Sequence, residues 1–198
     1  LHYVRDEEDA SLLVQCIFNC TSANRDQTAD SFWEKTERAI LEALILYMVQ
    51  CRPKEERNFA AVLKLLNDAK TDEHGLDALD KLFGETKNTA KEDSFTVRYH
   101  DFKQAGKKTA MSILTAAAVR LAVFAREDIQ TLTKDDQMEI EMMSEEDTVT
   151  FLIPSANDDD AMLINMICTQ MMARLYKYAA EINCFPLPRQ VRFVMDDF

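Results

Sequence analysis

The sequence predicts a mainly helical fold that ends in a strand–helix–strand unit. The chain has 198 residues but only three Gly and four Pro. These two residue types punctuate loops and strands, so their scarcity favours long helices with few turns. Good helix formers such as Ala, Leu, Glu, Lys and Met recur along the chain. The pattern changes only near the end, where two short β-rich runs flank one helical stretch, as in part of an α/β domain.

The composition is that of a chain that can fold around a core. Hydrophobic residues make up 47% and charged residues 29%, which argues against disorder. No apolar run approaches the roughly 20 residues that a membrane-spanning helix needs, and the longest, 39–49, is interrupted by Glu42. No basic-then-apolar leader is present. We therefore expect a cytoplasmic piece of a longer protein, with any membrane segment of that protein outside it.

The chain is acidic, with 35 Asp and Glu against 23 Lys and Arg and a formal net charge of −12. A field of this sign repels phosphate backbones and attracts basic proteins. It disfavours nucleic-acid binding over the whole domain, although a local basic stripe could still act.

The cysteines follow no disulfide or zinc pattern. Their number, five, is odd, and the three histidines are scattered. A structural zinc site needs four converging ligands, so we expect reduced, packed thiols and no metal among these residues. The cysteines are Cys16, Cys20, Cys51, Cys168 and Cys184.

Helical periodicity places the first helix at residues 9–20, where apolar residues recur every three or four positions. A polar stretch at 21–30 follows and is typical of a loop. The next helix begins at Ser31, because Ser31 and Glu34 have the spacing of a capping box. It ends before Pro53, which cannot continue a helix.

Two shorter helices follow. Asn58 is suited to cap a third helix over 59–69, since its side chain can accept a free backbone N–H. A fourth helix covers 76–83, with Gly84 placed as its C-terminal stop.

Residues 94–126 are expected to form one long helix or two collinear helices, with Gly106 as a break or a site of close packing. The stretch AGKKT at 105–109 is similar to a phosphate-binding loop. It lacks the first glycine, an extra lysine stands before the threonine, and the flanks are helical rather than a strand and a helix. We therefore interpret it as a basic turn on a helix surface.

The C-terminal third predicts a βαβ unit. Residues 148–153, TVTFLI, are β-rich and mostly apolar, which predicts a buried strand ended by Pro154. A helix follows at about 159–182, and residues 191–195, VRFVM, form a second β-rich run. A strand–helix–strand order requires a parallel sheet.

The second β-rich run ends in two carboxylates, and VRFVMDDF has the Walker B pattern. In that pattern Asp196 holds the Mg²⁺ shell as metal ligand, and Asp197 is the catalytic carboxylate that polarises the attacking water. Acidic residues after a strand also occur in plain solvated turns, and that alternative stays open.

Two surface features bear on binding. One cluster of basic residues stands out, and it predicts either a solvated helix face or a contact with DNA or an acidic partner. Phe32 and Trp33, at the start of the second helix, are expected in the core or as a staple at the helix end. The basic cluster consists of Arg98, Lys103, Lys107 and Lys108.

Several segments together resemble the TraG/TraD-like coupling proteins of conjugative type IV secretion, above all those of Gram-positive elements. The resemblance covers nearly the whole chain, in order and at similar spacing. It lies in DSFWEKTERAILEALILYM (30–48), NFAAVLKLL (58–66), FKQAGKKTAMSIL with VRLAVF (102–124), TVTFLIPSAND (148–158) and VRFVMDDF (191–198).

The resemblance implies a helical bundle inserted in part of a RecA-like α/β nucleotide-binding domain. Residues 30–135 match the all-α substrate-recognition domain of the family. Residues 1–29 and 136–198 match pieces of the nucleotide-binding domain, and Asp196 matches the Walker B aspartate. The family usually has Glu where this chain has Asp197, which puts the catalytic role of Asp197 in doubt.

The family also implies the activity and the partners. Coupling proteins are membrane-anchored, hexameric ATPases that use ATP and Mg²⁺ to pass relaxase-bound single-stranded DNA to the secretion channel. We expect residues 30–135 to recruit a relaxase or relaxosome accessory protein, with secretion-channel proteins as further partners. The family's phosphate-binding loop lies upstream of these segments, so we expect no ATP hydrolysis by this chain alone. We also expect this chain by itself to be a monomer. A module that contacts single-stranded DNA and a nucleotide-binding motor piece remain the alternatives.

Overall fold

The computed structural model describes residues 1–21, 31–71, 75–85, 94–154 and 158–195. The chain divides into two compact units, Leu1–Asp135 and Asp136–Phe198, here called the helical unit and the C-terminal unit. Regular structure in the described ranges is helical throughout, which confirms the mainly α class. None of these described helices is both long and apolar enough to span a membrane.

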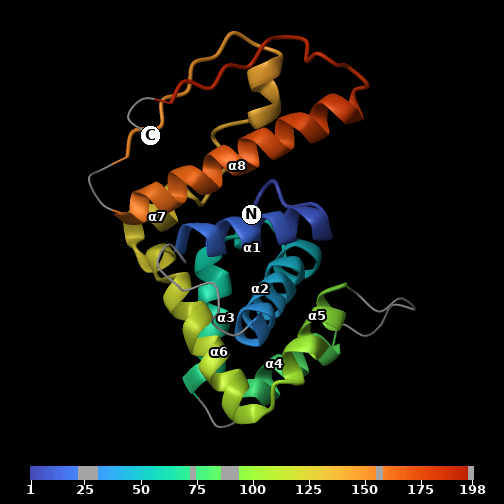
Figure 1. The fold of residues 1–198 in the computed structure, drawn as a ribbon, viewed down its shortest axis with the longest axis vertical. Coiled ribbons are helices and arrows are strands. Elements are labelled where there is room, and N and C mark those ends of the chain that lie inside the picture. Colours follow the sequence, from blue (N-terminus) through green and yellow to red (C-terminus); the bar gives the residue numbers. More distant parts are fainter. Residues whose placement is uncertain (22–30, 72–74, 86–93, 155–157, 196–198) are drawn as a thin grey trace. The chain divides into compact units, whose positions relative to one another are not determined.

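The elements follow one another along the chain as Figure 1 shows. The helical unit contains α1 (Glu7–Thr21), α2 (Ser31–Cys51), η1 (Lys54–Glu56), α3 (Phe59–Thr71), α4 (Gly75–Glu85), α5 (Ser94–Lys103), α6 (Lys107–Arg120), η2 (Ala122–Ala125) and α7 (Glu127–Leu132). The C-terminal unit contains η3 (Ile140–Ser144) and α8 (Asp158–Glu181).

The helix α2 is the centre of the helical unit, where it packs against α1, α3, α5 and α6 (Figure 1). Every side chain from Ile40 to Val49 is buried, so this stretch is covered all round rather than on one face. Glu42 interrupts that apolar run and is buried as well, and its carboxylate pairs with Arg98 of α5. A buried charge needs such a partner, because losing water without one is costly.

Aromatic rings fix α4 and α5 against α2. Tyr47 of α2 meets Phe83 of α4 and Phe95 of α5 edge to face, with centroid distances of 5.6 and 5.9 Å. Phe83 also stacks on Tyr99 of α5 at 4.3 Å, and the Tyr99 hydroxyl donates to Asp80 of α4 at 3.0 Å. Each aromatic pair contributes about 0.5–1.5 kcal/mol beyond its buried area.

The first helix also belongs to the helical unit. It packs against α2. Nε2 of His2 lies 3.2 Å from the carbonyl oxygen of Lys134, which is close to the last residue of the same unit in sequence. The division of functions between residues 1–29, 30–135 and 136–198 remains a prediction.

Three predicted helix boundaries can be compared with the structure. Asn58 Oδ1 accepts the N–H of Ala61 at 2.9 Å, which confirms the predicted cap of α3. Gly106 separates α5 from α6 with φ 74° and ψ 153°, a conformation essentially confined to glycine, so the predicted break is confirmed. The two helices diverge there instead of being collinear (Figure 1). The predicted stop at Gly84 is wrong, because α4 continues through it to Glu85.

The two predicted strands are wrong for this chain. Residues 148–153 and 191–195 have no regular secondary structure, and Val149, Phe151 and Ile153 are 79%, 80% and 86% exposed rather than buried. A strand is stable only when a neighbour takes up its backbone hydrogen bonds. Among the described residues, neither stretch has such a neighbour.

The chain on either side of α8 is joined at Arg189. Its backbone N–H donates to the carbonyl oxygen of Ser144 at 3.0 Å, and its Nε donates to that of Glu145 at 2.9 Å. Its guanidinium also pairs with Asp147. The segments before and after α8 therefore lie side by side at this point (Figure 1).

A buried arginine fixes η3 to α8 in the C-terminal unit. Arg174 is 5% exposed and donates to both carboxylate oxygens of Glu181 at 2.8 Å and, through Nε, to Glu141 of η3 at 2.5 Å. The hydrogen bonds to Glu181, and then those to Glu141, raise the pKa of the Arg174 guanidinium, although burial opposes the shift. The arginine therefore stays charged and holds both carboxylates.

Candidate interaction site on the helical unit

The two carboxylates of the Walker B pattern, Asp196 and Asp197, lie outside the described residues. Their roles with Mg²⁺ and with the attacking water stay predictions. In the part of the chain that the structure describes, no group of three or more His, Cys, Asp or Glu side chains could hold a metal ion.

The predicted basic cluster does not form one free surface. Arg98 pairs with the buried Glu42 and lies 3.6 Å from Glu7 of α1, so it joins three helices. Lys103 donates to Asp80 at 2.6 Å, from α5 to α4. Carboxylates of the same unit already pair with these two cations, so the cations would bind an external phosphate less strongly.

The other two members of the cluster remain exposed. Lys107 and Lys108 begin α6, directly after the Gly106 turn, and neither has an ion-pair partner within the described ranges. The flanks of this turn are helical, as predicted for 105–109. Two adjacent exposed lysines are a small basic feature compared with the positively charged groove that usually follows a nucleic-acid strand.

The acidic charge is concentrated in the C-terminal unit. Residues 136–198 carry 12 Asp and Glu against four Lys and Arg, a formal charge of −8. Residues 30–135 carry 18 against 17, which leaves −1. The net charge of −12 therefore does not by itself keep nucleic acid away from the 30–135 range.

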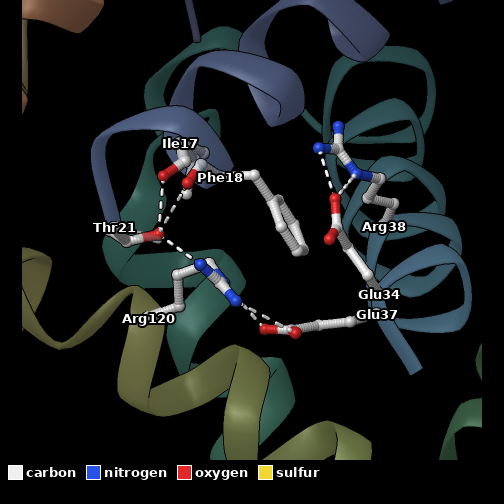
Figure 2. Close-up of polar contacts among 7 residues, drawn as sticks. All are labelled: Ile17, Phe18, Thr21, Glu34, Glu37, Arg38 and Arg120. Carbon is white, nitrogen blue, oxygen red and sulfur yellow. Dashed lines mark hydrogen bonds and ion pairs between the residues drawn. The ribbon is translucent and has the colours of Figure 1, made fainter. Parts of the chain in front are cut away.

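A buried cluster joins α1, α2 and α6 (Figure 2). Arg120, the last residue of α6, forms a bidentate ion pair with Glu37 of α2, with Nε–Oε1 and Nη2–Oε2 distances of 2.8 and 3.2 Å. The two side chains are 8% and 6% exposed. Arg120 also donates to the hydroxyl of Thr21, which in turn donates to the Ile17 carbonyl oxygen at 2.7 Å. Three helices thus share one polar network.

The aromatic centre of this cluster is Phe18 of α1. Its ring lies between the guanidinium groups of Arg120, 3.9 Å from the centroid, and Arg38, 4.3 Å away (Figure 2). Arg38 is held by Glu34 one turn earlier, at 2.8 Å. A guanidinium over an aromatic face is attracted by the ring quadrupole, and by about 2 kcal/mol when water is excluded. Phe18 is therefore clamped by two cations.

Phe32 and Trp33 are on the surface, so the expectation that they lie in the core is wrong. They are 51% and 42% exposed and meet edge to face, with centroids 6.5 Å apart and planes at 83°. They stand on the first turn of α2, next to Glu34 of the Phe18 cluster. Adjacent exposed Phe and Trp side chains are unusual on a unit whose core is otherwise closed, and such residues mark interaction sites.

Only some residues of this site could be recognised from the sequence. Phe32 and Trp33 are visible as an aromatic pair at a helix start, but their exposure depends on which face of α2 the other helices cover. Arg120 and Glu37 are 83 residues apart, and nothing local links them. Glu42 is conspicuous because it interrupts the apolar run 39–49, but Glu37 stands among the charged residues Glu34, Lys35 and Arg38 and gives no such signal.

A family model described as type IV secretory system, conjugative DNA transfer, matches residues 1–198, the full length of the chain. Comparison with curated proteins found no match, and comparison with solved structures found none either.

Proposed function

Because the chain belongs to the family of type IV secretory system proteins for conjugative DNA transfer, we propose that its helical unit recruits relaxosome or secretion-substrate proteins to the DNA-translocating ATPase of that system. In this proposal the docked protein is a relaxase or an accessory protein of the relaxosome. The chain works in the cytoplasm, at the inner face of the bacterial membrane, and delivers its partner to the secretion channel.

The observation that carries the proposal is the exposed pair Phe32–Trp33 on a unit with a closed core. Aromatic residues bury a large area at low entropic cost and are the commonest anchors of protein–protein interfaces. The turn of α2 that follows the pair is held by ion pairs, because Arg38 binds Glu34 and Arg120 binds Glu37. A rigid aromatic anchor favours recruitment over a purely structural role for this unit.

A protein partner is favoured over naked single-stranded DNA. Binding of single strands needs a basic groove as well as stacking rings. Arg98 and Lys103 are bound to carboxylates of the same unit, which leaves Lys107 and Lys108 as the exposed part of the predicted cluster. The alternative of a DNA-contacting module rests on those two lysines.

The C-terminal unit has a second role in this proposal, as a piece of a RecA-like nucleotide-binding domain. Residues 148–153 and 191–195 flank α8 in the order of a βαβ unit, and several of their apolar side chains are exposed, namely Val149, Phe151, Ile153, Val194 and Met195. Pairing with further strands would bury them and satisfy their backbone groups. Mg²⁺ bound with ATP would neutralise the charge that develops on the transferred phosphoryl group, and Asp196 and Asp197 are the carboxylates we assign to that site.

Recruitment is tested by affinity capture from a lysate of donor cells that carry the same conjugative element. The lysate is treated with nuclease, so that DNA cannot bridge the chain to other proteins. We expect the relaxase or a relaxosome accessory protein to be enriched and identified by mass spectrometry. Capture that disappears with nuclease treatment would favour the DNA-contacting alternative, and enrichment of neither protein would contradict the proposal.

A further inference from the structure

The Phe18 ring and the Phe32–Trp33 pair differ in their surroundings. Phe18 is buried and has a guanidinium near its ring from Arg120 and another from Arg38. Within the described residues, no cation lies over the ring of Phe32 or Trp33. The ring of Phe18 on α1 is therefore covered by two arginines, whereas the two rings at the start of α2 are exposed to solvent.

The charges around the open rings are already balanced. Glu34 is held by Arg38 at 2.8 Å, and Glu37 is held by Arg120. The Phe32 carbonyl oxygen accepts a hydrogen bond from the Thr36 hydroxyl at 2.8 Å. These polar groups are thus already bonded within α2 or to α6, and a polar ligand would have to displace these bonds. Lys35 is the exposed cation beside the pair. What remains available is mainly the aromatic surface, and its electron-rich faces attract a cation.

We propose that Phe32 and Trp33 form the binding site for an arginine side chain of the recruited protein. The contact would be of the same kind as the stacking of arginine on Phe18, but between two proteins. This inference rests on the proposed recruitment function and adds the chemistry of the contact. Arginine fits better than lysine, because its guanidinium is flat, weakly hydrated and stacks on rings, whereas an ammonium is compact and strongly hydrated. Trp is the strongest of the aromatic partners for such a contact.

The fluorescence emission of Trp33 can report on binding at this site, because Trp33 is the only tryptophan of the chain. Two peptides that alternate glycine with arginine, or glycine with lysine, are titrated at millimolar concentration and physiological salt against the full chain. An oligothymidylate serves as the nucleic-acid probe. The two peptides have equal charge and meet the same repulsion from Lys35, so the difference between them isolates stacking on the rings.

We expect the arginine peptide to change Trp33 emission with a dissociation constant about two- to fivefold lower than that of the lysine peptide. Phe32→Ala keeps the reporter and should remove most of that preference, whereas Leu132→Ala, at another exposed apolar residue of the helical unit, should leave it unchanged. Folding of each variant is checked by its thermal transition.

Three results would overturn the inference. They are equal responses to the two peptides, no Trp33 response to the arginine peptide, and stronger binding of the oligothymidylate than of either peptide. Recruitment could still hold in each case, because capture of the relaxase by the chain is measured separately.

Discussion

Arg120 of α6 and Glu37 of α2 form a bidentate ion pair across 83 residues of sequence, with Nε–Oε1 at 2.8 Å and both side chains less than a tenth exposed. The pair also positions Thr21 and Phe18 of α1, so it joins the three helices around the candidate site. Such a buried pair contributes little net free energy compared with a well-packed apolar pair, but it is costly to break, because one charge is then left buried without a partner.

Arg120→Ala should therefore lower the free energy of unfolding by about 3–5 kcal/mol. The measurement is urea denaturation of the full chain, followed by far-ultraviolet circular dichroism. The double variant Arg120→Met with Glu37→Leu removes both charges while keeping volume, and it should recover much of the loss. If the double variant is less stable than Arg120→Ala, the pair is not the reason for the effect.

A matched control comes from an exposed pair in the same unit. Arg126 binds Asp128 two residues away, with side chains that are 35% and 61% exposed, and this contact lowers the pKa of the Asp128 carboxyl. Surface pairs are screened by water and salt and contribute little to stability. Arg126→Ala should leave the urea midpoint nearly unchanged, and a loss similar to that of Arg120→Ala would refute the distinction between buried and exposed pairs.

Gly84 in α4 and Gly106 at the start of α6 should respond oppositely to alanine. Neither has an atom within 4 Å of the position that a Cβ would take, so the backbone conformation alone decides whether alanine stabilises or destabilises the fold. Gly106→Ala forces alanine into a conformation that only glycine adopts readily, and it should destabilise the helical unit by about 1–3 kcal/mol. Gly84→Ala replaces a helical glycine and should stabilise by roughly 0.5–1 kcal/mol. Urea denaturation of both variants checks this, and a shift of the same sign for both would be inconsistent with the described φ of 74° at Gly106.

Cys168 of α8 should react more slowly than Cys51 in an alkylation experiment. Burial raises the pKa of its thiol above the ordinary value of 9.0, so the thiolate fraction at a given pH is smaller. Cys51 is exposed at the end of α2 and serves as the comparison. Iodoacetamide labelling between pH 7 and 10, followed by peptide mass spectrometry, should show later labelling of Cys168 with a midpoint above pH 9. Equal labelling rates at pH 8 would contradict this.

The helices were predictable from the sequence because their signals are local. The capping side chain of Asn58 and the break at Gly106 act within one turn, and both are found in the structure. The stop at Gly84 failed because glycine only weakens a helix, and packing of Phe83 on Tyr99 and Phe95 keeps α4 intact there.

The parts that failed depend on partners distant in sequence. Residues 148–153 have the composition of a strand, but a strand needs a neighbour, and composition does not supply one. The exposure of Trp33 is set by how α1 and α6 cover α2, and the role of Arg98 is set by Glu42 on another helix. A basic residue that appears free in sequence can thus be an internal cross-link in the folded unit.

In the full-length protein, we expect Asp196→Ala to block DNA transfer and to leave substrate docking intact. The reason is that Asp196 follows the second β-rich run in a pattern that predicts a Walker B aspartate, whereas we propose that docking belongs to the helical unit. Mating efficiency measures the first effect, and relaxase capture by the same variant measures the second. Loss of both in a protein shown to be folded would contradict this division of labour.

The most direct test of recruitment is the dissociation constant between the full chain and the purified relaxase of the same element, measured at physiological salt. The account predicts binding that Trp33→Ala weakens about tenfold, as expected for a central aromatic anchor, and that Leu132→Ala does not change. It would be contradicted if Trp33→Ala had no effect on the relaxase, or if single-stranded DNA bound the chain more tightly than the relaxase and charge reversal at Lys107 and Lys108 abolished that binding.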